Sequence, residues 1–287
     1  MIDQIFRLYK KTLPDIFQSD SAVQTILENP SNHIIMRCDG SDLIAVSVVN
    51  KNAIYLLCTD QRARNRGLGS ELLAESEEYI FSNGYQKVVL GAGADYIMPG
   101  VPMNNNMHLF FVKRGYTHAW GDCGCFDMDM DLSDFRNNRQ AIGDVINGIK
   151  YRWASKNDIG DIVNCVTDAD ESMVRWYKNR YLYEKGTTSP VLIAELNGEI
   201  VGTLIVGIVD CMDANTGSVG CTATAHRHRG KQIATNLITL ATKHLQDIGC
   251  KRAYIGYTYT DLLRMYGRVG YKIYMEYFMG KKITEYQ

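Results

Sequence analysis

Two stretches of this chain align with each other without a gap, and this internal repeat is the strongest constraint on its fold. They read LLCTDQRARNRGLGSELLAESEEYIFSNGYQKVVLG (56–91) and CTATAHRHRGKQIATNLITLATKHLQDIGCKRAYIG (221–256). Three residues of the first stretch coincide with three of the second: Arg64 with Arg229, Gly84 with Gly249, and Gly91 with Gly256. A repeat of this length predicts two homologous domains.

The length agrees with this prediction. The chain has 287 residues, and a soluble domain holds roughly 100–200 residues. We predict a first domain at residues 1–134, a polar linker at 135–148 and a second domain at 149–287. Each half is long enough to bury a core of its own.

Both halves show the same order of elements: a helical region, a hairpin, a third strand, a helix, a fourth strand, a last helix and a last strand. The Asn197-Gly198 pair between two apolar runs is the clearest hairpin signal. In the first half we expect helices at 3–28, 69–83 and 108–113, and strands at 33–38, 43–49, 53–59, 87–90 and in the residues up to 131. In the second half we expect helices at 159–167, 174–183, 233–248 and 261–269, and strands at 191–195, 200–209, 219–224, 252–257 and 274–280.

Composition excludes several classes of partner. The net charge is −1, so no basic field attracts nucleic acid or an anionic membrane. The longest apolar stretch, residues 201–209, is too short to span a bilayer, and no targeting segment is recognisable at the start. Cys123 and Cys125 are too close for a zinc knuckle, and we expect no metal site. We expect reduced thiols in a cytoplasmic protein.

The turn after the repeated strand has the chemistry of a phosphate site. In the first copy Arg64, Gly67 and Gly69 lead directly into a helix. Glycines let backbone N–H groups approach an anion, the helix N-terminus adds a positive dipole, and the arginines add charge. Neither a GxGxxG motif after the strand nor a GxxxxGK[ST] motif is present, which disfavours a Rossmann site and a Walker loop.

At these residues the chain resembles the GNAT acetyltransferase superfamily, whose members use acetyl-CoA. Both halves show the arginine- and glycine-rich turn before a helix, and both end their last helix with a similar motif, FVKRGY (111–116) and YGRVGY (266–271). The resemblance implies an α/β (α+β) fold of two tandem GNAT domains, each with a mixed, mostly antiparallel sheet flanked by helices. It also implies that the turn binds the pyrophosphate of CoA, and that the thioester lies where the preceding strand splays from the next one.

The two copies differ at the residues that the family uses. A tyrosine on the last helix commonly protonates the departing thiolate; this position is Phe111 in the first half and Tyr266 in the second. Because general acid catalysis contributes roughly 10²–10⁴ in rate, we predict that the second domain is the catalyst, although Gln232 replaces its central glycine. Its expected CoA-binding residues are Thr222, Ala223, Thr224, Arg229, Gly230, Lys231, Gln232, Ile233 and Ala234.

The first domain is then a degenerate copy. It either binds CoA through Arg64, Gly67 and Gly69 or shapes the acceptor cleft.

For the general base we nominate Asp210 and Asp213, which lie in an insertion of the second half; the alternative is a solvated turn. The acceptor is expected at residues 168–181, for which the alternative is an ordinary amphipathic helix. The loop DYIMPGVP (95–102) is expected to cover the acceptor, and the alternative is a purely structural loop. The candidate acceptor residues are Asp168, Asp170, Glu171, Trp176, Tyr177, Asp95 and Tyr96.

The expected reaction is direct attack of a primary amine on the thioester of acetyl-CoA. The tandem layout and the DYIMPGVP loop resemble bacterial glucosamine and glucosaminide N-acetyltransferases of cell-wall sugar salvage, which implies an amino-sugar acceptor. Two alternatives stay open. The acceptor is another amine (an aminoglycoside, a polyamine, an amino acid or a protein N-terminus), or the protein is a non-catalytic acetyl-CoA sensor. The sequence leaves the oligomeric state open.

Overall fold

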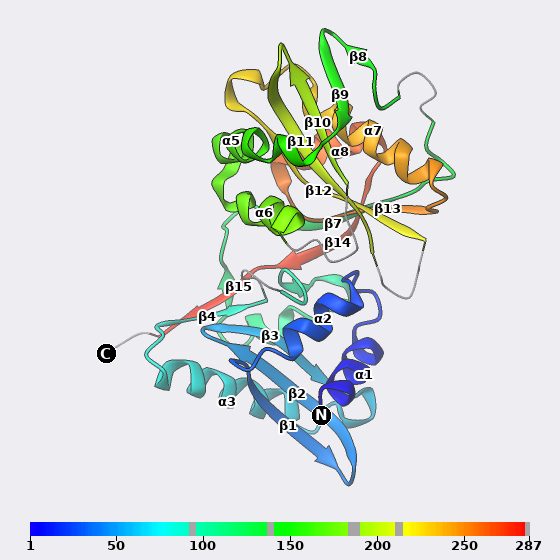
Figure 1. Cartoon of the computed structure of the whole chain (residues 1–287). Coiled ribbons are helices and arrows are strands. Elements are labelled where there is room, and N and C mark those ends of the chain that lie inside the picture. Colours follow the sequence, from blue (N-terminus) through cyan, green and yellow to red (C-terminus); the bar gives the residue numbers. More distant parts are fainter. Residues whose placement is uncertain (92–95, 137–140, 183–189, 210–214, 285–287) are drawn as a thin grey trace. The chain divides into compact units, whose positions relative to one another are not determined.

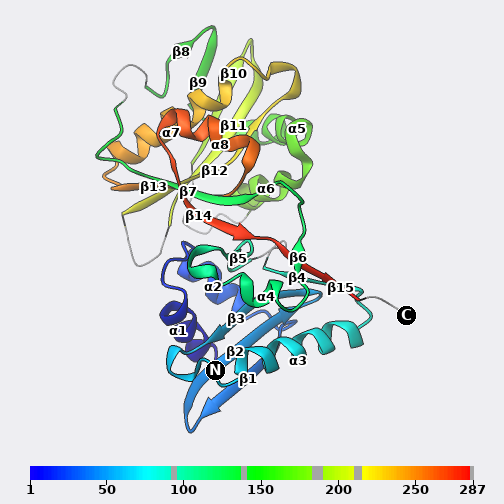
Figure 2. The same cartoon turned by 180° about the vertical axis from the view of Figure 1, so that it is seen from behind.

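The computed structural model of the protein describes residues 1–91, 96–136, 141–182, 190–209 and 215–284. The chain forms two compact units, which are drawn in Figures 1 and 2. The first unit consists of Met1–Phe126 with Met275–Gln287, and the second unit is Asp127–Tyr274. The predicted fold class is confirmed, because each unit has a mixed, mostly antiparallel sheet with helices on its faces.

The sheet of the first unit has the strand order β1-β2-β3-β4-β15-β6. Helices α1 and α2 cover one face, and α3 and α4 cover the other (Figures 1 and 2). Its elements are α1 (Ile2–Thr12), α2 (Asp20–Leu27), β1 (His33–Asp39), β2 (Asp42–Asn50), β3 (Ala53–Thr59), α3 (Leu68–Ser82), β4 (Lys87–Leu90), β5 (Val101–Pro102), α4 (Leu109–Val112), β6 (Thr117–His118) and β15 (Gly280–Ile283).

Strands β3 and β4 are parallel and pair only briefly. The register joins Ala53 to Val89 and Ile54 to Leu90. Beyond Ile54, β3 keeps its antiparallel pairing with β2 on one side as far as Thr59, but it has left β4 on the other. This divergence opens one edge of β3 inside the sheet.

The second unit contains β7 (Cys125–Asp131), β8 (Val145–Ile146), β9 (Ile149–Trp153), α5 (Ile159–Asp170), α6 (Val174–Leu182), β10 (Val191–Leu196), β11 (Glu199–Ile208), β12 (Thr216–Thr224), α7 (Ile233–Asp247), β13 (Arg252–Tyr259), α8 (Leu263–Val269) and the start of β14 (Lys272–Phe278). Its strands follow the order β14-β7-β13-β12-β11-β10-β9-β8.

Strand β11 shows why this sheet is apolar on both faces. Ile200 and Ile205 pack under α5 and α6, whereas Val201, Leu204 and Val206 pack under α7 and α8. A strand covered by helices on both sides reads as a continuous apolar run rather than an alternating one.

The compact units are bounded differently from the repeat. The repeat places residues 275–287 with the second domain, but in the structure they belong to the first unit, where β15 pairs with β4 and β6. Strand β8 (Val145–Ile146) lies inside the predicted linker 135–148 and pairs with β9 through an Asn147-Gly148 turn. Internal similarity reveals which segments are strands, whereas the sheet that a terminal strand joins depends on contacts distant in sequence.

We predict that Gly280→Ala destabilises the first unit. A Cβ on Gly280 would lie 2.5 Å from Leu90 Cδ1 and 2.9 Å from Phe278 Cε1. Overpacking a core costs about 1–3 kcal/mol, which lowers the melting temperature by roughly 2–12 °C. The control is Gly267→Ala in α8, where the added methyl meets open space and helix propensity improves. Equal melting temperatures for the two variants would contradict the tight fit of β15.

Candidate functional site

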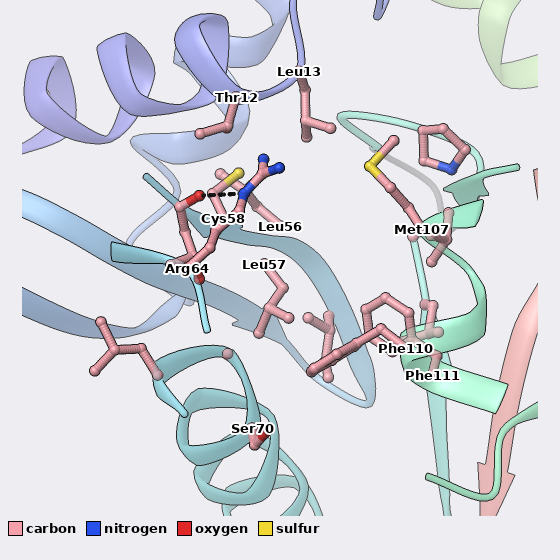
Figure 3. Close-up of a pocket in the computed structure, with 18 of the residues that line it drawn as sticks. Thr12, Leu13, Leu56, Leu57, Cys58, Arg64, Ser70, Met107, Phe110 and Phe111 are labelled. Atoms are coloured by element: carbon pink, nitrogen blue, oxygen red, sulfur yellow. Dashed lines mark hydrogen bonds between the residues drawn. The ribbon is translucent and has the colours of Figure 1, made fainter. Parts of the chain in front are cut away.

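A cavity of about 570 Å³ lies in the first unit where β3 leaves β4. Its floor is β3 from Ile54 to Thr59, and α1 contributes Thr12 at one side. Phe110 and Phe111 of α4 stand opposite, as Figure 3 shows. The cavity therefore follows the edge of β3 where, among the described residues, the pairing with β4 ends at Ile54.

The cavity ends at the N-terminus of α3. Gly67 caps this helix with φ +86°, and no side chain caps it. Ser70 and Glu71 donate their N–H groups to the carbonyl of Gly67, as in any first turn. The earlier amides of a helix have no partner within the helix, so this end of the cavity favours an anion.

Arg64 stands beside this helix start. Its Nε donates to the carbonyl oxygen of Thr59 at 3.4 Å, and its guanidinium projects into the cavity (Figure 3). The described residues that line the cavity include two arginines, Arg64 and Arg114, and no aspartate, glutamate or histidine. A cavity with this lining suits a ligand that is anionic at one end and apolar along the rest.

A loop covers the point where the strands diverge. Gly91 follows β4 with φ +66°, and a Cβ there would lie 2.7 Å from the carbonyl oxygen of Met98. The same loop contributes Met98 and Gly100 to the cavity wall, and the carbonyl of Tyr96 accepts a hydrogen bond from Gln18 at 2.9 Å. The predicted DYIMPGVP loop thus lines a cavity of its own unit, and Asp95 lies outside the described residues.

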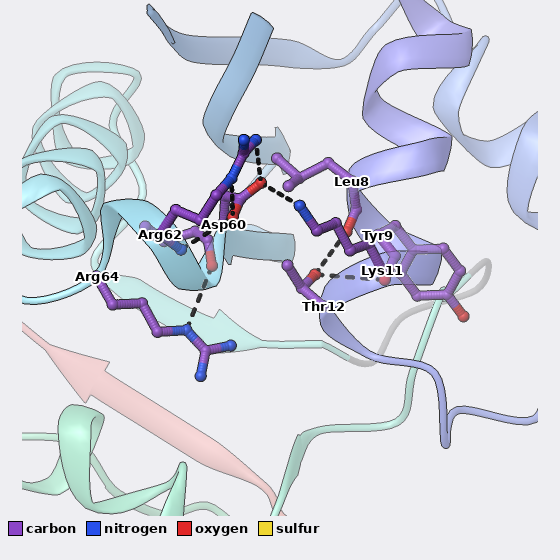
Figure 4. Close-up of polar contacts among 8 residues, drawn as sticks. Leu8, Tyr9, Lys11, Thr12, Asp60, Arg62 and Arg64 are labelled. Carbon is purple, nitrogen blue, oxygen red and sulfur yellow. Dashed lines mark hydrogen bonds and ion pairs between the residues drawn. The ribbon is translucent and has the colours of Figure 1, made fainter.

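Asp60 joins α1 to the turn before α3 (Figure 4). Its side chain is 3% exposed and accepts hydrogen bonds from Lys11 Nζ at 2.7 Å and from the Arg62 N–H at 3.0 Å. Lys11 precedes Thr12, a residue of the cavity wall. The hydrogen bond from Lys11, with those from Arg62, holds the pKa of the Asp60 carboxyl well below its usual range.

Two further side chains limit the chemistry of the cavity. Phe111, 8% exposed, occupies the position where a proton donor is expected and has no proton to give. Burial raises the pKa of the Cys58 thiol to about 12. Since the thiolate is the nucleophilic form, a neutral Cys58 does not form a covalent intermediate at physiological pH.

The corresponding turn of the second unit is occupied by protein groups. Arg229 Nη2 donates to the carbonyl of Ala169 at 3.2 Å, and Arg227 pairs with Glu199. Lys231 Nζ lies 3.2 Å from His228 Nδ1. Arg229 and Lys231, which were predicted to bind CoA, therefore already have protein neighbours.

The helix that follows this turn begins differently. Gln232 caps α7 in the left-handed region, with φ +60°, a conformation that costs a residue with a Cβ more than it costs Gly67. Gly230 also has a positive φ, whereas Ile233 is 1% exposed and belongs to the apolar core. Ala234 follows in the first turn of α7.

Tyr266 lies between two diverging strands of the second unit. Strands β12 and β13 pair only from Thr216 to Ser218. Tyr266 is 5% exposed, and burial raises the pKa of its hydroxyl, which lies near the side chains of Thr222 and Thr258. The Oγ1 atoms of both threonines are buried and form no hydrogen bond within the described part of the chain.

The candidate acceptor residues of the second unit have internal partners as well. The Asp168 carboxylate accepts the His226 N–H at 2.6 Å, and this bond lowers its pKa. Asp170 accepts the Ser172 N–H at 2.9 Å. Tyr177 is completely buried and donates to the carbonyl of Cys221 at 2.5 Å, so its ring packs in the core and offers no face to a sugar.

The other candidates are placed as follows. Glu171 is exposed, Trp176 is partly buried against the core, Ala223 is 2% exposed and Thr224 ends β12. Asp210 and Asp213 lie outside the described residues. In the part of the chain that the structure describes, no group of three His, Cys, Asp or Glu side chains could hold a metal ion. Over the same residues, every helix is too short or too polar to cross a bilayer.

Sequence reasoning missed Asp60 and Arg114. Asp60 is recognised by its contact with Lys11, a residue of another element. Arg114 contacts Ser70 across the cavity rim. The one available signal was the difference between the copies, because Val269 stands in the second motif where Arg114 stands in the first.

The chain matches the model of the acetyltransferase (GNAT) family over residues 2–97 and 157–271. Among solved structures, it is similar to the glucosamine N-acetyltransferase region of a fungal multi-domain GH3 β-N-acetylglucosaminidase. The TM-score is 0.79 at 16% identity, over 98% of this chain and 37% of that one. This chain therefore spans well under half the length of the fungal protein.

Two further structures match over most of both chains. A GCN5-related N-acetyltransferase from Sphaerobacter thermophilus gives a TM-score of 0.74 at 17% identity, over 98% of this chain and 91% of that one. A tandem GNAT protein from the clavulanic acid biosynthesis pathway gives 0.72 at 12% identity, over 100% and 95%. At these identities the similarity establishes the fold.

We predict that Asp60→Asn destabilises the protein in a pH-dependent way. Because the folded-state pKa of Asp60 is lowered, its ion pairs add stability above the unfolded-state value of about 4, and this stability is lost as the pH falls through the folded-state pKa. Urea unfolding at a series of pH values should show a deficit for the variant near neutral pH that narrows below about pH 4. Exposed Asp261→Asn is the control. A deficit independent of pH would contradict the ionic role.

Proposed function

Because the chain belongs to the GNAT acetyltransferase family, we propose that its first unit binds acetyl-CoA and that the acetyl group is transferred there to a primary amine. One observation carries this choice of the first unit. The cavity along the open edge of β3 leads to an uncapped helix N-terminus, and its described lining has two arginines and no carboxylate.

The residues of this cavity fit the parts of acetyl-CoA. The amides at Gly67 and Gly69 with the Arg64 guanidinium suit the pyrophosphate. Among the described residues, β3 has no further pairing with β4 beyond Ile54. The backbone N–H and C=O groups on this edge suit the pantetheine amides, as an edge strand suits an added strand. The apolar wall of α4, with Phe110 and Phe111, suits the remainder of the arm.

The chemistry requires little from side chains. The amine attacks the thioester carbonyl directly, since Cys58 is neutral and forms no acyl intermediate. Backbone N–H groups on the open edge of β3 stabilise the developing oxyanion. The bond from carbon to sulfur then breaks, the electron pair leaves on the thiolate, and the nitrogen gives up one proton, which reaches the sulfur or solvent through water.

The absence of a proton donor at Phe111 does not prevent this reaction. A thiol has an unperturbed pKa of about 8.5, so its thiolate is a stable leaving group near neutral pH. General acid catalysis would accelerate the step but is not indispensable. The incoming amine must be neutral, because an ammonium group has no electron pair to donate.

The second unit is the weaker candidate for the cosubstrate. The buried Tyr266 lies between Thr222 of β12 and Thr258 of β13, and the Arg229 guanidinium donates to the carbonyl of Ala169. The buried Oγ1 atoms of these threonines, which have no protein partner among the described residues, are the observation in favour of this unit. The sequence-based assignment of catalysis to this unit, with Tyr266 as the acid, stays a prediction that the variants below test against the first unit.

For the acceptor we propose an amino sugar, glucosamine or a glucosaminide. Support comes from the DYIMPGVP loop and from the similarity to a fungal region whose own acceptor is glucosamine. Other primary amines are the alternative within the same chemistry. A protein that binds acetyl-CoA without catalysis, as a sensor, is the alternative outside this chemistry. The observation in favour of a sensor is Phe111, which cannot donate a proton at the position where the family has a tyrosine.

A matched pair of arginine variants tests which unit binds the cosubstrate. We expect Arg64→Met to weaken CoA binding, measured by calorimetry, about tenfold to a hundredfold, because it removes a charge-assisted hydrogen bond. Arg229→Met should change the dissociation constant less than about twofold, since that guanidinium has an additional protein partner in the carbonyl of Ala169. The reverse pattern would move the site to the second unit.

Turnover by Tyr266→Phe tests which of the two units carries the catalytic site. Free thiol release is measured with glucosamine, an aminoglycoside, a polyamine and an amino acid as acceptors. We expect glucosamine turnover, and a kcat of the variant within about twofold of the wild type. A loss of tenfold or more, the size expected for a lost general acid, would return catalysis to the second unit. CoA binding without turnover of any amine would favour the sensor.

A further inference from the structure

Arg114 presents a positive charge at the cavity rim. It follows α4 and is partly buried. Its Nη1 donates to the carbonyl of Phe110 at 2.7 Å, and its Nη2 donates to Ser70 Oγ at 2.7 Å. The guanidinium carbon lies 3.8 Å from the centre of the Phe110 ring. Three contacts therefore fix the orientation of this charged group.

The same guanidinium has no carboxylate partner within the described part of the chain, where the other partly buried arginines, Arg37, Arg152 and Arg252, pair with Glu or Asp. A guanidinium has five N–H donors, and the hydrogen bonds of Arg114 to Phe110 and Ser70 use two of them. A partly buried cation without a counter-ion is unfavourable. A ligand anion would supply the missing charge.

Arg64 and Arg114 reach the start of α3 from different elements. Arg64 reaches the cavity from the β3 side, through Thr59. Arg114 reaches it from the α4 side, through Ser70 in the first turn of α3. Two guanidinium groups thus meet the same ligand space from different elements. CoA likewise carries two separate anions, the pyrophosphate and the 3′-phosphate on the ribose.

We propose that Arg114 binds the 3′-phosphate of CoA and so makes the first unit selective for CoA over dephospho-CoA. The inference rests on the proposed binding of acetyl-CoA in this unit. The amides at Gly67 and the Arg64 guanidinium suit the pyrophosphate, which leaves the second cation for the second anion. Val269 at the corresponding position of the second unit has no such capacity.

Calorimetric binding of CoA and of dephospho-CoA tests the proposal without any turnover. The wild type should bind CoA about tenfold to a hundredfold more tightly than dephospho-CoA, the effect of one charge-assisted contact. Arg114→Met should lose this preference: its affinity for CoA falls by the same factor, and its affinity for dephospho-CoA changes less than about twofold. Unchanged dephospho-CoA binding also shows that the variant is folded.

Lys113→Met is the matched control, because Lys113 is exposed on the same turn and does not line the cavity. It should keep the preference for CoA. The inference would be overturned if Arg114→Met lost affinity for CoA and for dephospho-CoA equally, or if the wild type bound both ligands with the same affinity. Either result would leave the proposed function standing. A wild type that binds neither ligand would overturn both.

Discussion

The proposed site depends on the early divergence of β3 from β4. Two residue pairs hold these parallel strands together, and beyond Ile54 the edge of β3 is open to a ligand. Gly91 makes the divergence possible, because its positive φ turns the chain away from β3 and its lack of a Cβ admits the backbone of Met98 and Gly100. A side chain at this position would push the covering loop outward and remove one wall of the cavity.

The same divergence occurs in the second unit with a different result. There Tyr266, Thr222 and Thr258 bring their hydroxyl groups into the gap, and carboxylates or carbonyls of the protein engage the basic turn. A buried polar group must find a partner, from the protein or from a ligand. In the second unit the protein supplies partners for the basic turn, but the described residues supply none for the Oγ1 atoms of Thr222 and Thr258; at Arg114 and at the start of α3 a ligand can supply them.

Much of the fold could be predicted from the sequence, because apolar residues recur at a regular spacing along helices and strands. The strands at 53–59 and 87–90 were predicted with the bounds that the structure has. Strand β15 was missed, since a four-residue strand near the chain end has too few positions to show a pattern. The site was predicted less well. The motif revealed Tyr266 and Phe111, but the enclosure of Tyr266 depends on neighbours distant in sequence.

The charge of the cavity bears on the missing base. The described lining has two guanidinium groups and no carboxylate, so it attracts the phosphates of the cosubstrate. Once the cosubstrate is bound, its phosphates offset this positive charge, and the described lining offers no carboxylate that could take a proton from an incoming ammonium. An acceptor whose amine is weakly basic, and therefore largely neutral near pH 7, fits such a site because it needs no base.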